Sequence, residues 1–217
     1  MNYTQDIKKK VKFAIQIFEN HKAELTQCGQ LSVLDWRRPG SVFYAVRIVF
    51  DPERYNAVYI TGDLGCAVIR PTCRASLDAM ARCFTLRNSD RMVSVNVEYF
   101  MEKFETSSDR HEWSEETFIE DLRNQCTVRG LVPPEDLIDT IEVGWSSPVE
   151  FFEHDRPPCI SEAARQDLRK MDADYAEWIH DCGKRVSLSV ILWLVALRLA
   201  SEQIEQRDNC QEGGTNG

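Results

Sequence analysis

The stretch from Val42 to Ile69, VFYAVRIVFDPERYNAVYITGDLGCAVI, decides the fold. Its apolar, aromatic and β-branched residues come in three short runs, a pattern typical of strands, and turn residues separate the runs. The runs span 42–50, 57–60 and 66–69, with turns at 51–54 and 62–65. Links this short join antiparallel neighbours, because a parallel pair needs a crossover of about a dozen residues or more. The stretch therefore predicts an antiparallel meander.

The segments on either side extend this prediction. Leu31–Trp36 reads as one more strand before the turn at Arg38–Ser41, so the predicted sheet covers about 31–70. Apolar residues at helical spacing predict an N-terminal helix over 6–27 that ends near Gly29. Helices are also predicted at 74–84, from Ser114, from Pro134, at 161–182 and at 186–207, and 92–97 alternates like a strand.

The resulting fold class is α+β: a small antiparallel sheet packed with an N-terminal helix and a helical C-terminal half. We expect one domain over residues 1–217, because a chain of this length forms a single core without a disulfide or a metal. The stretch 105–112 is the candidate boundary between the sheet part and an acidic helical part.

Charge is distributed unevenly along the chain. The formal net charge is −9, yet residues 1–91 carry 14 basic against 9 acidic side chains, a balance of +5. Residues 92–217 carry 12 against 26, a balance of −14. An acidic surface repels phosphate and attracts a basic protein surface, which disfavours broad nucleic-acid binding by this part. The alternative is that the acidity serves solubility alone.

The acidic residues are densest between Glu98 and Asp121. On a helix-loop-helix they would present negative charge at phosphate-like spacing, which suits the basic groove of a nuclease. A solvated acidic face is the other interpretation. The candidate partner-binding residues are Glu102, Glu105, Asp109, Glu112, Glu115, Glu116, Glu120 and Asp121.

The sequence also indicates a compartment. No apolar signal segment follows the lysines at 8–10, so we expect the cytoplasm of a bacterial host cell. The apolar run Val186–Leu197 reaches only about 18 Å as a helix, against a hydrocarbon core of about 30 Å. We therefore expect a buried helix and no membrane partner. The eight cysteines lack a Cys-x-x-Cys pair and read as reduced structural thiols.

No catalytic motif is complete. The string Gly62–Gly65 lacks the residues of a phosphate loop, and His111-Glu112 lacks the second histidine of a zinc protease. We expect neither a metal nor another cofactor. Two alternatives stay open: an enzyme that uses a cysteine or a carboxylate cluster near Asp35, Asp63 or His154, and a structural accessory protein of a mobile element. In the latter, Trp36, Tyr44 or Trp145 would anchor an interface if they are exposed. The favoured interpretation of these aromatic residues is that they are buried.

Three segments carry a resemblance: VLDWRRPGS at 33–41, YAVRIVFD at 44–51 and VYITGDLG at 58–65. Together they resemble small proteins carried by phages and mobile elements of gut Firmicutes that are associated with type II-A anti-CRISPR activity. The resemblance covers residues 30–70 and contains no catalytic signature. It implies a stoichiometric inhibitor that blocks DNA binding or cleavage by Cas9.

The sequence leaves the details of such binding open. It does not say whether guide RNA or DNA is also contacted, or whether the chain is oligomeric. A basic face in the first part would contain Arg37, Arg38, Arg47, Arg54, Arg70 and Arg74.

Overall fold

The computed structural model describes residues 3–87, 93–108, 110–131 and 162–212. By compactness the chain divides into two units. The sheet unit contains residues 4–110 and 187–217, and the inserted unit contains 111–186 together with residues 1–3. The first division falls between Arg110 and His111, within the stretch 105–112. A single domain over the whole chain stays a prediction.

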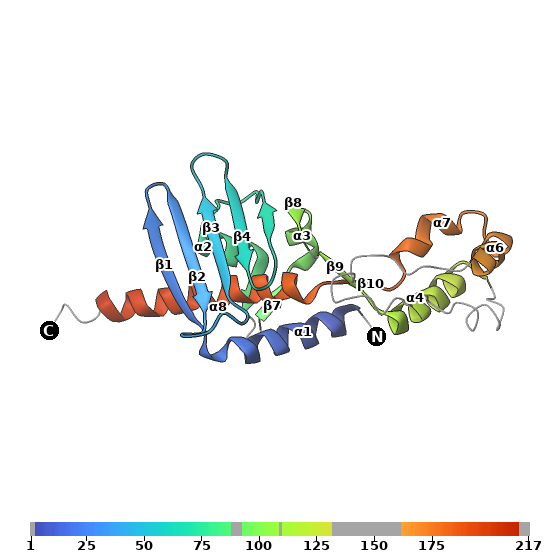
Figure 1. The fold of residues 1–217 in the computed structure, drawn as a ribbon, viewed down its shortest axis with the longest axis horizontal. Coiled ribbons are helices and arrows are strands. Elements are labelled where there is room, and N and C mark those ends of the chain that lie inside the picture. The colour runs from blue at the N-terminus through green and yellow to red at the C-terminus, as the bar shows by residue number, and fades with distance from the viewer. Residues whose placement is uncertain (1–2, 88–92, 109, 132–161, 213–217) are drawn as a thin grey trace. The chain divides into compact units, whose positions relative to one another are not determined.

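The sheet unit contains a six-stranded antiparallel sheet, which confirms the α+β class (Figure 1). The strand order is β1-β2-β3-β4-β5-β8, so neighbours in sequence pair until the last strand. The strands are β1 Lys22–Cys28, β2 Leu31–Arg37, β3 Val46–Asp51, β4 Ala57–Gly62, β5 Ala67–Ile69 and β8 Phe104–Ser107. The sheet is therefore larger than the predicted 31–70, because a strand is added at each edge.

The predicted helix over 6–27 is wrong in its last third. Helix α1 covers Tyr3–Ile17, a short 3-10 helix η1 covers Phe18–Asn20, and β1 follows. Strand β1 pairs with β2 along its whole length, from Lys22 opposite Arg37 to Cys28 opposite Leu31. This pairing satisfies backbone groups along the strand and outweighs the weak helical spacing of Leu25.

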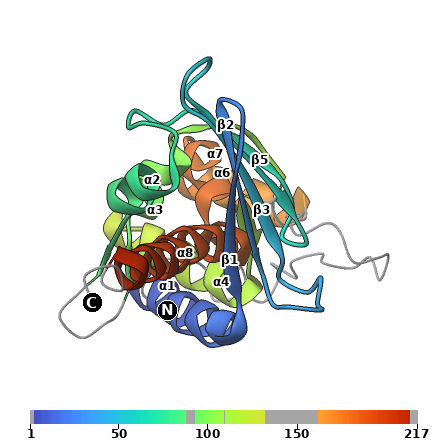
Figure 2. The same cartoon turned by 90° about the vertical axis from the view of Figure 1, so that its left-hand side faces the viewer.

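The core of the sheet unit lies on one face of the sheet. Figure 2 shows helices α1, α2 (Leu77–Phe84), α3 (Val97–Met101) and α8 (Leu188–Glu212) on the same side of it. Every residue from Val190 to Leu197 is buried, which confirms the buried helix expected from the apolar run. Among the described residues, no helix has the length and hydropathy to span a membrane.

The predicted strand at 92–97 exists but does not join the main sheet. Strand β7 (Val93–Val95) pairs with β6 (Thr85–Arg87) in a separate two-stranded sheet. Alternation identifies a strand and does not say which strand it will pair with.

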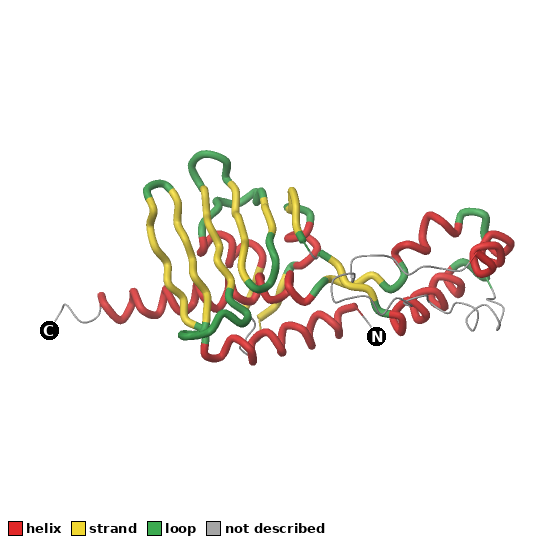
Figure 3. Tube along the Cα trace, in the orientation of Figure 1, coloured by secondary structure: helices red, strands yellow, loops and turns green. Residues whose placement is uncertain are grey.

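The inserted unit begins and ends with two paired strands, β9 (His111–Trp113) and β10 (Lys184–Val186), drawn in yellow in Figure 3. Helix α4 (Glu115–Val128) starts as predicted at Ser114, whose side chain accepts a hydrogen bond from the Thr117 amide. Helices α6 (Glu162–Met171), α7 (Tyr175–Trp178) and the 3-10 helix η2 (Ile179–Asp181) follow. The helix predicted from Pro134 lies outside the described residues.

The helix predicted over 161–182 is interrupted after Met171. The Asp172 carboxylate accepts a hydrogen bond from the Asp174 amide at 2.9 Å and from Trp178 Nε1 at 3.0 Å. A side chain that bonds the backbone two residues ahead forms a turn in place of a helical one. The apolar residues on both sides of the break still pack into one cluster, together with those of α4. The buried residues of this cluster are Phe118, Leu122, Cys126, Ala164, Leu168, Tyr175, Trp178, Ile179 and Cys182.

A buried histidine contacts the 3-10 helix η1 and strand β2. His21 is 2% exposed, and its ring centroid is 4.8 Å from that of Phe18 and 5.6 Å from that of Trp36. Neither ring nitrogen has a hydrogen-bond partner among the described residues. Burial lowers the pKa of His21; the nearby backbone of Tyr44 opposes this effect, and Arg38 adds to it. The folded protein therefore holds His21 neutral.

This burial predicts a stability loss in mild acid. The unfolded chain binds a proton at about pH 6.5 while the folded chain resists it, so the free energy of unfolding should fall as the pH drops below that value. Urea unfolding followed by tryptophan fluorescence, between about pH 5 and 7.5, measures the effect. His21→Phe should reduce the pH dependence, and His180→Phe, at an exposed histidine, is the matched control. Equal pH dependence in the wild type and His21→Phe would contradict the conclusion that the folded protein holds His21 neutral.

Candidate protein-binding surface

The eight predicted carboxylates fall into two groups. Glu102 and Glu105 belong to the sheet unit, and Asp109 lies outside the described residues. The inserted unit contains Glu112, Glu115, Glu116, Glu120 and Asp121. The helix-loop-helix interpretation is wrong, because β8 and β9 lie between α3 and α4. Strand formation at 104–107 and 111–113 separates the two groups along the chain.

Asp121 has a structural role. Its carboxylate accepts two hydrogen bonds from Arg185, at 2.9 and 3.0 Å, and a third from the Gly183 amide at 2.9 Å. Both charged side chains are largely buried. A bidentate pair in this setting ties α4 to β10 and leaves little of the Asp121 charge for a partner.

The structure therefore predicts a large stability loss for one acidic residue and a small one for its neighbour in sequence. Asp121→Ala should lower the free energy of unfolding by about 2–4 kcal/mol, because it leaves the Arg185 charge buried without its carboxylate. Glu120→Ala, at an exposed side chain of α4, should change it by less than about 1 kcal/mol, because an ion pair at an exposed side chain contributes at most about that much. Denaturant titration of both variants measures this difference. Similar small losses in both would show that Asp121 is a surface group.

The remaining described carboxylates are more accessible. Glu105 lies 3.9 Å from Arg70, and Glu102 lies 3.7 Å from Lys103, in pairs whose acidic members are exposed. Exposed pairs of this kind add little to stability. Glu112 is half-buried on β9, opposite Arg185. Glu120 is exposed on α4, so its carboxylate is accessible to a partner.

The two structural units differ in charge more simply than residues 1–91 and 92–217 do, because almost all of the net charge lies in one unit. The inserted unit carries 18 acidic and 8 basic side chains, a balance of −10. The sheet unit carries 17 acidic and 18 basic side chains, a balance of +1. The acidity of the whole chain is therefore a property of residues 111–186.

The arginines of the predicted basic face are mostly neutralised within the sheet unit. Arg47 makes a bidentate contact with Asp35, at 2.7 and 2.9 Å, and this contact raises the pKa of Arg47. Asp35 is therefore held in an ion pair. The other pairs are Arg37–Glu24, Arg70–Glu105 and Arg74–Glu53. Four of the six arginines present a balanced surface, which would attract phosphate weakly.

A second accessible feature is the loop between β2 and β3. Val42 and Phe43 are 74% and 72% exposed, although the sequence predicted them inside a strand. Tyr44 follows with φ +56°, and its amide donates a 2.7 Å hydrogen bond to the Asp63 carboxylate. Asp63 therefore holds a strained residue in place. Trp36, a proposed interface anchor, is fully buried.

Gly62, at the end of β4, lets the chain approach the loop between β2 and β3 closely. Its φ is +135°, and a Cβ atom there would lie 2.3 Å from the Ala45 carbonyl oxygen. Gly62→Ala should lower the free energy of unfolding by about 3 kcal/mol or more, because it combines backbone strain with a clash against backbone. The matched control is Gly40→Ala in the loop between β2 and β3, with φ +75° and no atom within 4 Å. Its cost should be about 1 kcal/mol. Thermal and urea unfolding compare them, and equal costs would refute the close-approach argument.

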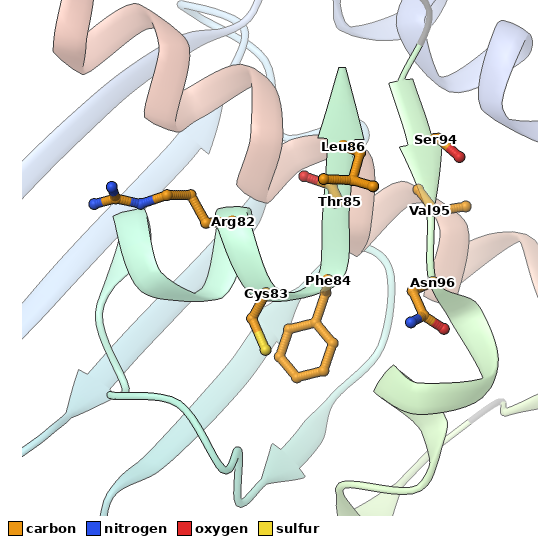
Figure 4. Close-up of a pocket in the computed structure, with 8 residues that line it drawn as sticks. All are labelled: Arg82, Cys83, Phe84, Thr85, Leu86, Ser94, Val95 and Asn96. Carbon is orange, nitrogen blue, oxygen red and sulfur yellow. The ribbon is translucent and has the colours of Figure 1, made fainter. Parts of the chain in front are cut away.

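A pocket of about 250 Å³ lies beside the β6–β7 pair (Figure 4). Figure 4 shows the Arg82 side chain extending away from the two strands, and Arg82 pairs with Asp78 one helical turn back. The thiol of Cys83 lines the pocket. Burial and a hydrogen bond with Cys83 raise the pKa of Cys73 to about 12, so that thiol is protonated at neutral pH and a poor nucleophile.

The other buried thiols are similar. Burial, with the Asp121 carboxylate, raises the pKa of Cys182 to about 12, and burial raises that of Cys126. Within the described ranges, no three histidine, cysteine or carboxylate side chains converge to hold a metal ion. His154 and Trp145 lie outside those ranges.

Comparison with models of known protein families, with curated proteins and with solved structures returned no match.

Proposed function

We propose that this protein is a stoichiometric inhibitor of a bacterial anti-phage nuclease, with guide-loaded Cas9 as the candidate target. The inserted unit is the part that binds, and it blocks DNA binding or cleavage by occupying a basic surface. The resemblance at residues 30–70 suggests the class of target, and the charge of the inserted unit suggests the mode of binding.

The observation that carries this proposal is the concentration of charge in one unit. A balance of −10 over 76 residues, beside a unit of +1, gives the molecule one strongly acidic part. A surface that binds nucleic acid is basic, so its field draws in an acidic protein and accelerates their association. Binding of this kind weakens as salt rises, because salt screens exposed charges.

The proposal predicts a one-to-one titration. Added to guide-loaded Cas9 that cleaves a matched DNA, the wild-type chain should abolish cleavage near one equivalent, and less effectively at higher salt. Reversal of Glu112, Glu115, Glu116 and Glu120 to lysine changes the formal net charge from −9 to −1. This variant should need about tenfold more protein or worse for half inhibition.

A matched control separates local charge from net charge. Glu19, Glu24, Glu53 and Glu98 are exposed in the sheet unit, and their reversal to lysine also gives −1. This control should inhibit like the wild type. Equal loss in both variants would mean that only total charge matters. Intact inhibition by the first variant would refute the acidic-surface mode, and no inhibition by the wild type at large excess would remove Cas9 as the target.

A further inference from the structure

The sheet has a second face that faces away from the helices. Along each strand, side chains alternate between the two faces. Leu34, Ile48 and Ile60 are fully or almost fully buried on the helix side. Their neighbours in sequence therefore point outward. Among the described residues of the sheet unit, no helix covers this outer face (Figure 2).

The register places four apolar side chains of this outer face in one row. Val33 lies opposite Val49, Val49 opposite Tyr59, and Tyr59 opposite Val68. The row thus crosses β2, β3, β4 and β5 without a charged residue, and its ends lie beside Thr26 on β1 and Thr106 on β8. The three valines are half-buried and Tyr59 is 38% exposed. An antiparallel sheet with one face in water normally carries polar side chains there, so a continuous apolar row indicates a protein contact.

Charged residues border the row, and they are neutralised in pairs. On one side Glu24, Asp35 and Arg47 lie opposite one another on β1, β2 and β3, and the pairs Arg47–Asp35 and Arg37–Glu24 form there. On the other side, at the ends of β5 and β8, lies the Arg70–Glu105 pair. An apolar centre with a polar rim is the ordinary anatomy of a protein interface.

We propose that this outer face, centred on Val49 and Tyr59, is the contact between two copies of this chain. A two-fold interface must be complementary to itself, and a neutral face with paired charges meets that condition. The charge argues for a second copy, because a strongly basic partner would find no net attraction here. Two acidic chains can approach each other most easily through a face without net charge.

The dimensions of the sheet set the strength of this contact. Six strands about 4.8 Å apart, with lengths of three to seven residues, give a face roughly 24 Å wide and about 10–23 Å long, or about 400–500 Å² in plan. A standard interface buries about 800 Å² on each partner. The dimer should therefore be in exchange with the monomer, with a dissociation constant in the micromolar range.

Sedimentation velocity of the purified chain over a range from about 1 to 500 µM tests this proposal. The wild type should shift from monomer to dimer within that range. Tyr59→Lys should stay monomeric, because it places a charge in the centre of the row. The triple variant Val33→Thr, Val49→Thr, Val68→Thr keeps side-chain volume and strand preference, and should weaken dimerisation at least about tenfold.

Circular dichroism confirms that each variant is folded, and the triple variant gives the answer if Tyr59→Lys does not fold. The matched control is Val128→Lys, which adds the same charge at a residue 84% exposed on α4 of the inserted unit. It should dimerise like the wild type. A wild type that remains monomeric at the highest concentration overturns the proposal, and so does a dimer that the triple variant forms equally well.

Discussion

The burial of helix α8 is the interaction on which the sheet unit depends. Eight successive residues, Val190–Leu197, are buried, so this helix is covered on all sides by the sheet and its neighbouring helices. Its side chain Gln203 also accepts a hydrogen bond from the Ala23 amide and donates one to the His21 carbonyl. A glutamine thus satisfies the Ala23 amide of the edge strand β1, which another chain would otherwise pair with, and the His21 carbonyl just before the strand. Because α8 follows the insertion in sequence, the core closes only when residues 187–212 return to it.

The return of the chain to the sheet unit at residue 187 constrains the inserted unit. Its two ends must lie together, and the β9–β10 pair holds them so. On the sheet side of the division, the Ser187 amide donates to the Arg110 carbonyl at 3.1 Å. Within the insertion, the Asp121–Arg185 pair ties α4 to the returning strand. The inserted unit has an apolar core of its own, with Phe118 and Leu168 buried in it.

The sequence predicted the features that depend on local pattern and missed those that depend on pairing. The runs at 57–60 and 66–69 are strands because their apolar residues and flanking turns agree. Strand β1 was missed because Lys22–Cys28 has little strand character of its own and is a strand through its pairing with β2. The break at Asp172 depends on the Trp178 indole, a contact that only the folded chain forms. The boundary at 186/187 lies inside one apolar run, so composition could not mark it. The boundary at 110/111, which divides the candidate carboxylates between the two units, falls within the predicted stretch 105–112.

The apolar row on the outer face of the sheet likewise depends on strand pairing and could not be predicted from local pattern. Val33, Val49, Tyr59 and Val68 come from four strands, and only the register brings them into one row, since a slip of one residue would turn each to the other face. Their bordering ion pairs are exposed, and such pairs contribute at most about 1 kcal/mol to folding. Their effect is therefore chiefly on the surface field. By neutralising the rim, they leave an apolar face without net charge on a chain that is acidic elsewhere, which is the condition under which two copies of it can meet.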